Sequence, residues 1–583
     1  MKVLLVAVNA KYIHSNLAVY SLLAYAKERL PEDMGVQIEI AEYTINHRTE
    51  DILAEIYKAK PDVLCFSCYI WNIRCVTELV EEYHKLRPGT PIWVGGPEVS
   101  YETEAFLAAH GPVKGVMCGE GEQTFLELCA YYAAEYGGQS GGAQGDISRK
   151  AGGRMSDIAG IVYRDGGTIQ VTGCREALAL SSIPFCYSDL EDFRNRIIYY
   201  ESSRGCPFRC SYCLSSVEKQ LRFRALDLVK RELAFFIEKE VAQVKFVDRT
   251  FNCKHAHAME IWRFIQEHDN GITNFHFEIA ADLLSDEEFA LIRGMRPGLI
   301  QLEIGVQSTH GETITEIHRT MRLPRLKEAV RKIQEGGNVH EHLDLIAGLP
   351  FEDYRTFARS FDEIYALKPN QLQLGFLKVL KGSYMYEHVA EYGLIYRTQP
   401  PYEVLGTKWL DFSDILRIRQ AEEMLEVYYN SGQYEVSMKV LETQCESPFE
   451  MFTRLGAFYE KNGYFGMSHS RMRRAQILLA FAQEEATEAA PVLAESLTFD
   501  LYYREPMKSR PPWAQDAAEW RELAKKYAIK GGQSHVERFF YRFPDKRIRT
   551  LRCLPEREER AQYVRFDYTR RDPLDHQAFY EYL

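Results

Sequence analysis

Three closely spaced cysteines are the residues best suited to chemistry in this chain. Cys206, Cys210 and Cys213 have C-x3-C-x2-C spacing, so one short loop can fold three thiolates around a single metal centre. A structural zinc site needs four ligands, yet no histidine and no fourth cysteine lies between Arg196 and Phe223. Three thiolates instead fit a [4Fe–4S] cluster with one iron left open to another ligand.

The elements around the cysteines predict a barrel. Residues 195–398 contain strand-like runs separated by helical segments, an alternation that favours a partial (β/α)6 barrel of the TIM type. The expected strands are Ile197–Ser202, Gln243–Val247, His276–Ala280, Leu299–Ile304, His342–Ile346 and Gln371–Leu377. The cysteine run follows the first of them, at the barrel end where catalytic residues gather.

Residues 1–136 predict a second α/β domain, a Rossmann-like doubly wound parallel sheet. Strand-like runs alternate with helices, beginning with the continuously apolar Val3–Val8. Three loops at strand ends carry the polar and glycine-rich sequence: Ser67–Asn72, Gly95–Glu98 and Gly119–Glu122. Ligands of such sheets bind beyond these ends, and glycines let a bulky flat ligand approach the backbone.

Residues 137–194 predict a linker between the two domains. Gly137–Arg154 is rich in Gly and Ser, which predicts a flexible surface insertion. Ile158–Val171 predicts a hairpin with its turn at Asp165-Gly166-Gly167.

Residues 399–583 predict a mainly helical C-terminal extension. Apolar spacing favours helices over Leu416–Asn430 and Phe452–Glu485, and Tyr563–Tyr568 is a short strand-like run.

The net charge and the hydropathy pattern disfavour some classes of binding partner. The formal net charge of −12 argues against a chain that coats nucleic acid by charge alone. The sequence has neither the ~20 consecutive apolar residues of a membrane helix nor a signal peptide. We therefore expect a cytoplasmic protein without membrane or nucleic-acid partners, in which clustered cysteines bind metal rather than form disulfides.

The cysteine motif resembles the signature of the radical S-adenosylmethionine (SAM) superfamily. The resemblance implies that the open iron binds SAM and that one electron cleaves it to a 5′-deoxyadenosyl radical. It also implies SAM contacts from residues of the cysteine loop and barrel strands: Tyr212, Asp248, Glu278, Glu303, Gln307, Ile346 and Gly348. Val247–Phe251 departs from the family's Gly-Gly-Glu form, and Asp248 is able to bond the methionyl amine directly. For each carboxylate, a structural ion pair at the barrel mouth is the alternative.

The N-terminal loops resemble the cobalamin (B12)-binding domain of cobalamin-dependent radical SAM enzymes, a resemblance that spans about residues 1–400. It implies cobalamin contacts from the first strand end and the three loops: Asn9, Ser67, Tyr69, Trp71, Asn72, Gly95, Gly96, Pro97, Glu98, Gly119, Glu120, Gly121 and Glu122. The sequence lacks the Asp-x-His-x-x-Gly motif, and His14 lacks its spacing. We therefore expect base-off cobalamin with no protein histidine on cobalt. The C-terminal region resembles the uncharacterised extension of a bacterial subgroup.

The leading hypothesis is a cobalamin-dependent radical SAM enzyme that methylates an unactivated carbon via methylcobalamin. Its substrate is unidentified, no catalytic side chain is assigned, and an external donor of the flavodoxin or ferredoxin type supplies electrons. The alternatives are cobalamin-assisted rearrangement, cyclisation or oxidation, and a methylthiotransferase-like enzyme acting on tRNA. The last needs a second cysteine set, for which the available residues are Cys65, Cys68, Cys75, Cys118 and Cys129. A zinc-bound module without catalysis is the alternative from a different class.

Overall fold

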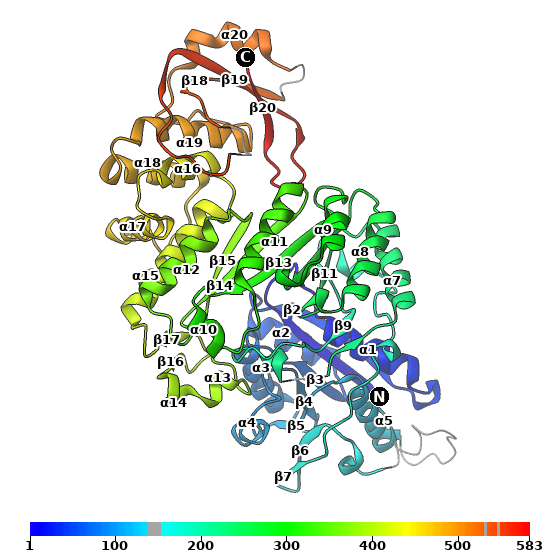
Figure 1. Ribbon diagram of the computed structural model, residues 1–583. Coiled ribbons are helices and arrows are strands. Elements are labelled where there is room, and N and C mark those ends of the chain that lie inside the picture. The colour runs from blue at the N-terminus through cyan, green and yellow to red at the C-terminus, as the bar shows by residue number, and fades with distance from the viewer. Residues whose placement is uncertain (138–152, 218–219, 530–532, 545–547) are drawn as a thin grey trace. The chain divides into compact units, whose positions relative to one another are not determined.

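The computed structural model describes residues 1–137, 153–217, 220–529, 533–544 and 548–583 (Figure 1). These residues form two compact units. The first comprises Met1–Leu283 with Lys378–Val404, and the second comprises Leu284–Leu377 with Leu405–Leu583. Among the described residues, no helix is both long enough and apolar enough to cross a membrane.

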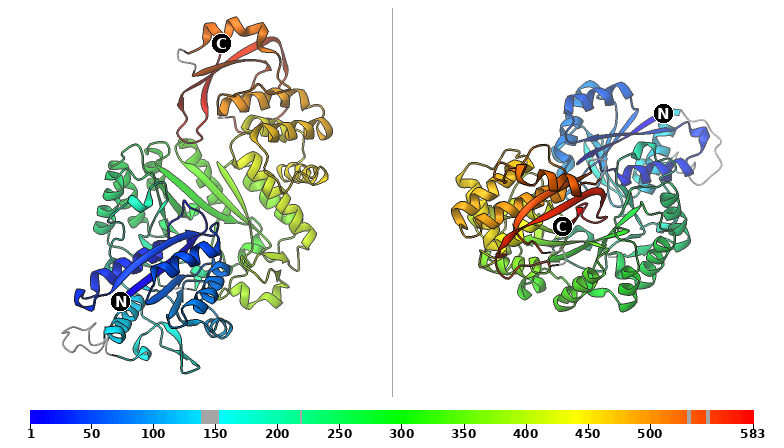
Figure 2. Two further views of the ribbon diagram at one scale, coloured as in Figure 1. Left: turned by 180° about the vertical axis from the view of Figure 1, so that it is seen from behind. Right: turned by 90° about the horizontal axis from the view of Figure 1, so that it is seen from above.

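The first unit begins with a seven-stranded sheet, drawn in blue to cyan in Figures 1 and 2, in the order β2-β1-β3-β4-β5-β6-β7. Its first five strands are parallel. The strands and helices of this part are β1 (Lys2–Asn9), α1 (Leu17–Arg29), β2 (Gln37–Thr44), α2 (Thr49–Ala59), β3 (Val63–Ser67), α3 (Ile73–Leu86), β4 (Ile92–Gly95), α4 (Thr103–Ala109), β5 (Val113–Met117) and α5 (Glu122–Gly137).

Two hydrophobic cores cover the two faces of this sheet, which explains why β1 is apolar throughout. Leu5 packs in one core with residues of α1 and α5. Its neighbours Leu4 and Val6 pack in the other core with residues of α2 and α3. Because successive side chains of a strand point to opposite faces, a strand buried on both sides needs a continuous apolar run. The predicted doubly wound sheet is confirmed.

The predicted hairpin extends this sheet. β6 (Ile161–Asp165) and β7 (Thr168–Val171) are antiparallel, and β6 pairs antiparallel with β5. The hairpin therefore belongs to the N-terminal sheet rather than to a separate linker. Of the predicted insertion Gly137–Arg154, residues 138–152 lie outside the described residues.

The first unit also contains three of the expected barrel strands. β11 (Gln243–Phe246) pairs in parallel with β8 (Ile198–Tyr200) and with β12 (Asn274–Ile279). The other elements here are the short strands β9 (Ser203–Arg204) and β10 (Arg222–Phe223), and helices α7 (Leu226–Glu238) and α8 (His255–Glu267). The segment Lys378–Val404 adds α13 (Tyr384–Glu387), α14 (Val389–Tyr392) and β16 (Ile395–Tyr396), and leads into β17 (Val404–Gly406).

The second unit contains the other three expected strands. β14 (His340–Ala347) pairs in parallel with β13 (Ile300–Gln307) and with β15 (Gln371–Phe376). Helices of the same unit alternate with them: α9 (Asp286–Arg293), α10 (Gly311–Glu316), α11 (Leu323–Gly336) and α12 (Tyr354–Tyr365). All six strands of the predicted βα region are present.

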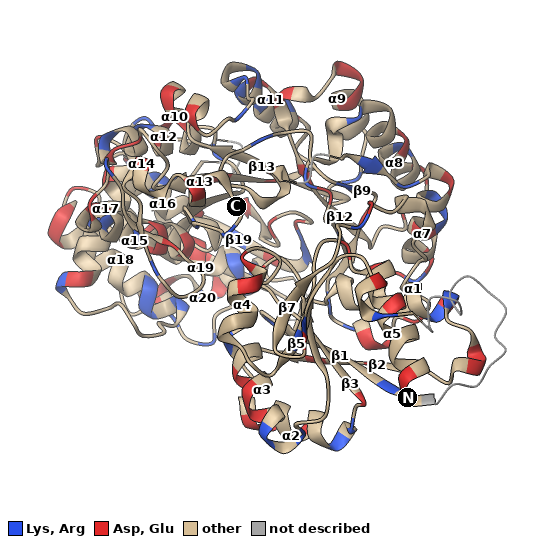
Figure 3. Cartoon of the chain, turned by 90° about the horizontal axis from the view of Figure 1, so that it is seen from below, with Lys and Arg blue, Asp and Glu red and all other residues tan. Residues whose placement is uncertain are grey.

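The C-terminal part of the second unit is mainly helical, as predicted. Its helices are α15 (Phe412–Leu425), α16 (Glu435–Glu442), α17 (Pro448–Lys461), α18 (Arg471–Glu485), α19 (Ala490–Arg504) and α20 (Arg521–Tyr527). The predicted helical region Phe452–Glu485 contains most of α17 and all of α18. An antiparallel sheet of β18 (Ser534–Tyr541), β19 (Arg557–Arg571) and β20 (Ala578–Tyr582) follows. Figure 3 shows acidic and basic residues interspersed along the helices of both units.

Candidate functional site

The cysteine run forms a loop that is closed at its base by two short strands. β9 and β10 pair antiparallel, with Ser203 opposite Phe223 and Arg204 opposite Arg222. Gly205 stands where the loop leaves β9, at φ +94°, and a Cβ there would lie 2.5 Å from the Gln220 carbonyl oxygen. Only glycine fits this close approach. The chain thus returns on itself and confines the three cysteines to one loop.

The three thiols share a partly buried environment. Cys210 is buried, whereas Cys206 and Cys213 are half-buried. Burial raises the pKa of the Cys206 thiol, as do the charges of Cys213 and Cys210. Thiols that influence one another in this way become stable thiolates when a metal centre replaces their protons. The donor set therefore fits an iron–sulfur cluster.

Asp248 supports the backbone that enters the cysteine loop. Its carboxylate accepts hydrogen bonds from the Ser202 N–H at 2.9 Å, the Ser202 hydroxyl at 2.7 Å and the Ser203 hydroxyl at 2.6 Å. Asp248 is fully buried, and burial raises its pKa to about 6 although these hydrogen bonds oppose the shift. Both oxygens have protein partners, which gives Asp248 a positioning role. Its direct contact with the methionyl amine stays a prediction.

A cavity of about 1380 Å³ opens beside the sheet within the first unit. It is lined by residues of the three predicted loops and by the chain that leads into the cysteine loop. The predicted cobalamin contacts along its wall are Asn9, Ser67, Tyr69, Trp71, Gly95, Gly96, Pro97, Gly119, Glu120, Gly121 and Glu122. Glu201, Ser203, Arg204 and Gly205 line the same cavity.

Gly96 allows two of these loops to approach closely. Its φ is +113°, and a Cβ at this position would lie 2.5 Å from the carbonyl oxygen of Cys68. The Cys68 N–H also donates a hydrogen bond to the Gly95 carbonyl at 2.7 Å. The backbone itself therefore forms part of the wall, as a large flat ligand requires.

Two aromatic side chains add a flat surface to the cavity. The rings of Tyr69 and Trp71 are stacked, with centroids 4.4 Å apart and planes 7° from parallel. The indole N–H of Trp71 donates to the Val8 carbonyl at 3.1 Å, which fixes the ring although 43% of the residue is exposed. His14 also lines the cavity, and its Nδ1 lies 2.6 Å from the Tyr199 hydroxyl.

Two predicted cobalamin contacts lie outside the cavity wall and have other roles. Asn72 is fully buried, accepting from the Tyr69 N–H at 2.8 Å and donating to the Val8 and Ser67 carbonyls, so it shapes the loop. Glu98 accepts a hydrogen bond from the Tyr402 hydroxyl. Both side chains thus have partners within the protein, and their contacts with cobalamin stay predictions.

The sequence did not reveal that Lys378–Val404 contacts both the cysteine loop and the chain just after the Gly95–Glu98 loop. The Met385 N–H donates to the Ser211 carbonyl of the cysteine loop at 3.1 Å. The Tyr386 hydroxyl donates to Glu102 at 2.6 Å, beside the Gly95–Glu98 loop. These residues lie far along the chain from their partners, and their pattern of residue types carries no signal that could have found them.

The remaining predicted SAM contacts lie on different elements. Tyr212 is in the cysteine loop and Glu278 is on β12, both half-buried in the first unit. In the second unit, Glu303 and Gln307 are on β13, Ile346 is on β14, and Gly348 follows β14.

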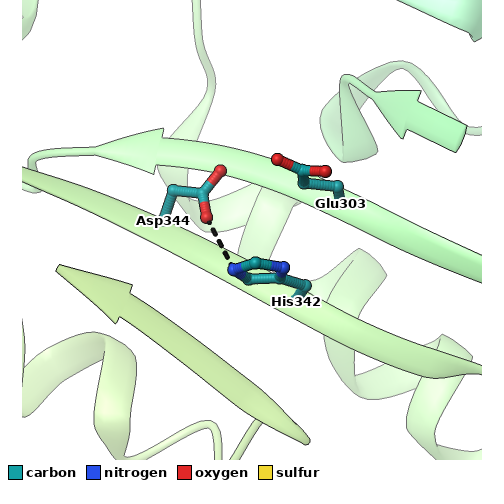
Figure 4. A group of neighbouring side chains, drawn as sticks. All are labelled: Glu303, His342 and Asp344. Atoms are coloured by element: carbon teal, nitrogen blue, oxygen red, sulfur yellow. Dashed lines mark ion pairs between the residues drawn. The ribbon is translucent and has the colours of Figure 1, made fainter. Parts of the chain in front are cut away.

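Glu303 is one of three polar side chains that gather on β13 and β14 (Figure 4). It is opposite His342 in the strand register, and His342 Nε2 lies 3.1 Å from Asp344 Oδ1. Such a set can hold a divalent cation or bind the hydroxyl and amino groups of a ligand. Sequence analysis missed His342 and Asp344, although polar residues at alternate positions of an otherwise buried strand were the available signal.

Comparisons with known proteins agree with this arrangement. The B12 binding domain model matches residues 3–129, the radical SAM superfamily model matches 200–364, and a family of unknown function, DUF4080, matches 390–568. The radical SAM match contains the entire cysteine loop. The chain contains a B12-binding domain and a radical SAM domain. Its two matched domains imply a [4Fe–4S] cluster, SAM and cobalamin.

Two curated relatives of this radical SAM protein are methyltransferases. The 2-(S-pantetheinyl)-carbapenam-3-carboxylate methyltransferase of Streptantibioticus cattleyicolor is 28% identical over 324 residues. The cobalamin-dependent radical SAM methyltransferase TokK of Streptomyces tokunonensis is 26% identical over 324 residues. Each match covers 51% of this chain and 44% of the relative, so the chain spans less than half the length of either.

Solved structures show the same fold. The radical SAM methyltransferase TsrM from Kitasatospora setae, with cobalamin and a [4Fe–4S] cluster bound, has a TM-score of 0.56 at 18% identity. That match covers 70% of this chain and 82% of TsrM. The cobalamin-dependent SAM radical enzyme OxsB, with aqua-cobalamin and SAM bound, has a TM-score of 0.56 at 15% identity, covering 85% of this chain and 75% of OxsB.

Proposed function

We propose that this protein transfers a methyl group from SAM, by way of cobalamin, to an unactivated carbon of its substrate. One observation carries the proposal: the predicted cobalamin loops and the entrance of the cysteine loop line the same cavity. When bound, the cluster supplies an electron to cleave SAM, and cobalamin supplies a carrier for the methyl group. Because the cavity is shared, one bound substrate can meet both the radical from SAM cleavage and the methyl group carried by cobalamin.

The chain contributes binding and orientation. Cys206, Cys210 and Cys213 hold the cluster, while Asp248 fixes the backbone that leads to them. Gly96 and the stacked Tyr69–Trp71 pair accept the flat face of cobalamin. The candidate SAM contacts are Tyr212 and Glu278 in the first unit, and Glu303, Gln307, Ile346 and Gly348 in the second. His14 Nδ1 is paired with the Tyr199 hydroxyl, and the cobalamin would be base-off, with no protein histidine on cobalt.

The relatives favour methyl transfer over rearrangement, cyclisation or oxidation. Besides the two already described, an uncharacterised methyltransferase of Pyrococcus horikoshii and a hopanoid C-3 methylase of Methylococcus capsulatus match at 24% identity. All four carry names of methyl-transferring enzymes.

Burial of the N-terminal cysteines disfavours the methylthiotransferase alternative. Cys65 and Cys129 are buried in one core of the sheet, whereas Cys68 is buried in the other. Burial raises the pKa of Cys65 to about 12. Thiols separated by a sheet and held protonated are unsuited to a second cluster.

Radical SAM chemistry requires an external reductant, and we propose a flavodoxin or ferredoxin as the donor. We also propose a cytoplasmic location, because a reducing compartment favours cysteines that bind metal over disulfides.

The test is anaerobic reconstitution with iron, sulfide and cobalamin, followed by incubation with methyl-labelled SAM, reductant and a small-molecule cell extract. We expect labelled methyl in a discrete product by mass spectrometry, and none with Cys213→Ala. Full SAM cleavage without any labelled product would overturn methyl transfer.

A further inference from the structure

Two arginines at the base of the cysteine loop reach the same loop of the N-terminal sheet. The Arg204 guanidinium donates to Glu122 at 2.9 Å and lies 3.4 Å from Glu120. Arg222, opposite Arg204 in the β9–β10 pair, donates to both oxygens of Glu120. The Gly119–Glu122 carboxylates thus hold both strands that close the cysteine loop.

Further hydrogen bonds fix these carboxylates in place. The Ser21 hydroxyl of α1 donates to Glu122 at 3.0 Å, and the Leu178 N–H donates to Glu120 at 3.1 Å. Glu201 accepts two further hydrogen bonds from the Arg204 guanidinium, of 2.9 and 2.8 Å. Glu120, Glu122 and Arg204 therefore each have at least two partners, which holds the geometry of both loops.

The network is largely shielded from water. The exposed fractions of the Arg204, Arg222, Glu120 and Glu122 side chains are 18%, 11%, 15% and 6%. Burial tends to raise the pKa of Glu120, yet Arg222 and Arg204 hold it below its ordinary value. Separating one partner would leave a poorly solvated charge behind, a strongly unfavourable change. A shift of one loop must therefore be followed by the other.

Both loops line the cavity, because Glu120, Glu122, Arg204 and Gly205 are all part of its wall. We propose that the pairing of Arg204 and Arg222 with Glu120 and Glu122 couples the two cofactor sites, so that assembly of the cluster tightens cobalamin binding. Such coupling is reciprocal, and cobalamin equally favours the cluster-bearing form of the loop. Arg204 and Arg222 are positioning residues in this account.

The test compares the affinity for hydroxocobalamin of cluster-free and cluster-reconstituted protein, measured by anaerobic absorbance titration. For the natural sequence we expect at least about fivefold tighter binding with the cluster, the low end of allosteric couplings. In Arg204→Lys and Glu122→Gln, the ratio of the dissociation constant without the cluster to that with the cluster should fall towards one. Glu127→Gln is the matched control, since Glu127 pairs with Arg175, and should keep the full ratio.

The titration needs no substrate, so its outcome is independent of whether methyl transfer occurs. A ratio of one in the natural sequence would overturn the coupling. The coupling would also be overturned if Arg204→Lys and Glu122→Gln kept the same ratio as the natural sequence. If circular dichroism showed that both variants fail to fold, the network would be a requirement of the fold, and the proposal would again be overturned.

Discussion

The carboxylate of Asp248 holds both the backbone N–H and the hydroxyl of Ser202, at 2.9 and 2.7 Å, four residues before the first cluster cysteine. This contact joins the end of β11 to the end of β8. It fixes the direction in which the chain enters the cysteine loop. The loop is thus positioned by a neighbouring strand as well as by its own residues.

Asp248→Ala should weaken cluster assembly. It leaves the buried Ser202 N–H without its acceptor, at a cost of about 1–3 kcal/mol. We expect a lower melting temperature and less iron bound per chain after reconstitution. Ser203→Ala removes one of the three hydrogen bonds and should have a smaller effect. Equal losses in the two variants would contradict the positioning role of Asp248.

Gly96→Ala should disrupt cobalamin binding. The added methyl would lie 2.5 Å from the Cys68 carbonyl oxygen, on a backbone at φ +113° that alanine adopts poorly. We expect at least about tenfold weaker binding of hydroxocobalamin, roughly 1.4 kcal/mol. Gly111→Ala is the control, because a Cβ there meets nothing within 4 Å. Unchanged affinity in Gly96→Ala would contradict the proposed location of cobalamin.

Removal of any one cluster cysteine should abolish the cluster and leave the fold intact. Cys213→Ala should lack the broad absorption that thiolate-ligated iron–sulfur clusters show at about 400 nm. It should still bind hydroxocobalamin, with the affinity of the cluster-free protein. Metal analysis of the natural sequence should give iron and sulfide. Zinc at one ion per chain with no iron would contradict the cluster.

Glu341 should make the second unit less stable as the pH rises. Burial raises the pKa of this carboxyl from 4.5 to about 8, despite Gln334 and Arg549. A raised pKa in the folded state means that folding favours the protonated carboxyl. The stabilisation is complete below about pH 4.5 and is lost as the pH rises through about 8.

The free energy of unfolding should therefore fall between pH 4.5 and 8, on the order of 1–4 kcal/mol from this group. Glu341→Gln mimics the protonated carboxyl and should flatten that part of the profile, measured by thermal melts across the range. Parallel profiles for the two proteins would show that Glu341 does not titrate as the geometry requires.

Local sequence was enough to predict the cysteine loop and the strand-end loops. Cys206, Cys210 and Cys213 lie within eight residues, so their spacing alone indicates a shared centre. The Gly95–Glu98 loop was found because parallel strands place their carboxyl ends together.

Contacts between distant segments could not be predicted. Asp248 was expected to bind SAM, but its partners lie about 45 residues earlier on another strand. Glu122 was expected to contact cobalamin, and its carboxylate also pairs with Arg204, 82 residues later. In both cases the sequence indicates a charged group near the cavity, and only the fold shows which opposite group it meets.

The most direct test of methyl transfer is to measure both products of SAM in one reaction. With cluster, cobalamin, reductant and substrate present, the account predicts 5′-deoxyadenosine and S-adenosylhomocysteine in equal amounts, because one SAM generates the radical and a second donates the methyl group. 5′-Deoxyadenosine formed with substrate but without S-adenosylhomocysteine would contradict methyl transfer and indicate a rearrangement, cyclisation or oxidation.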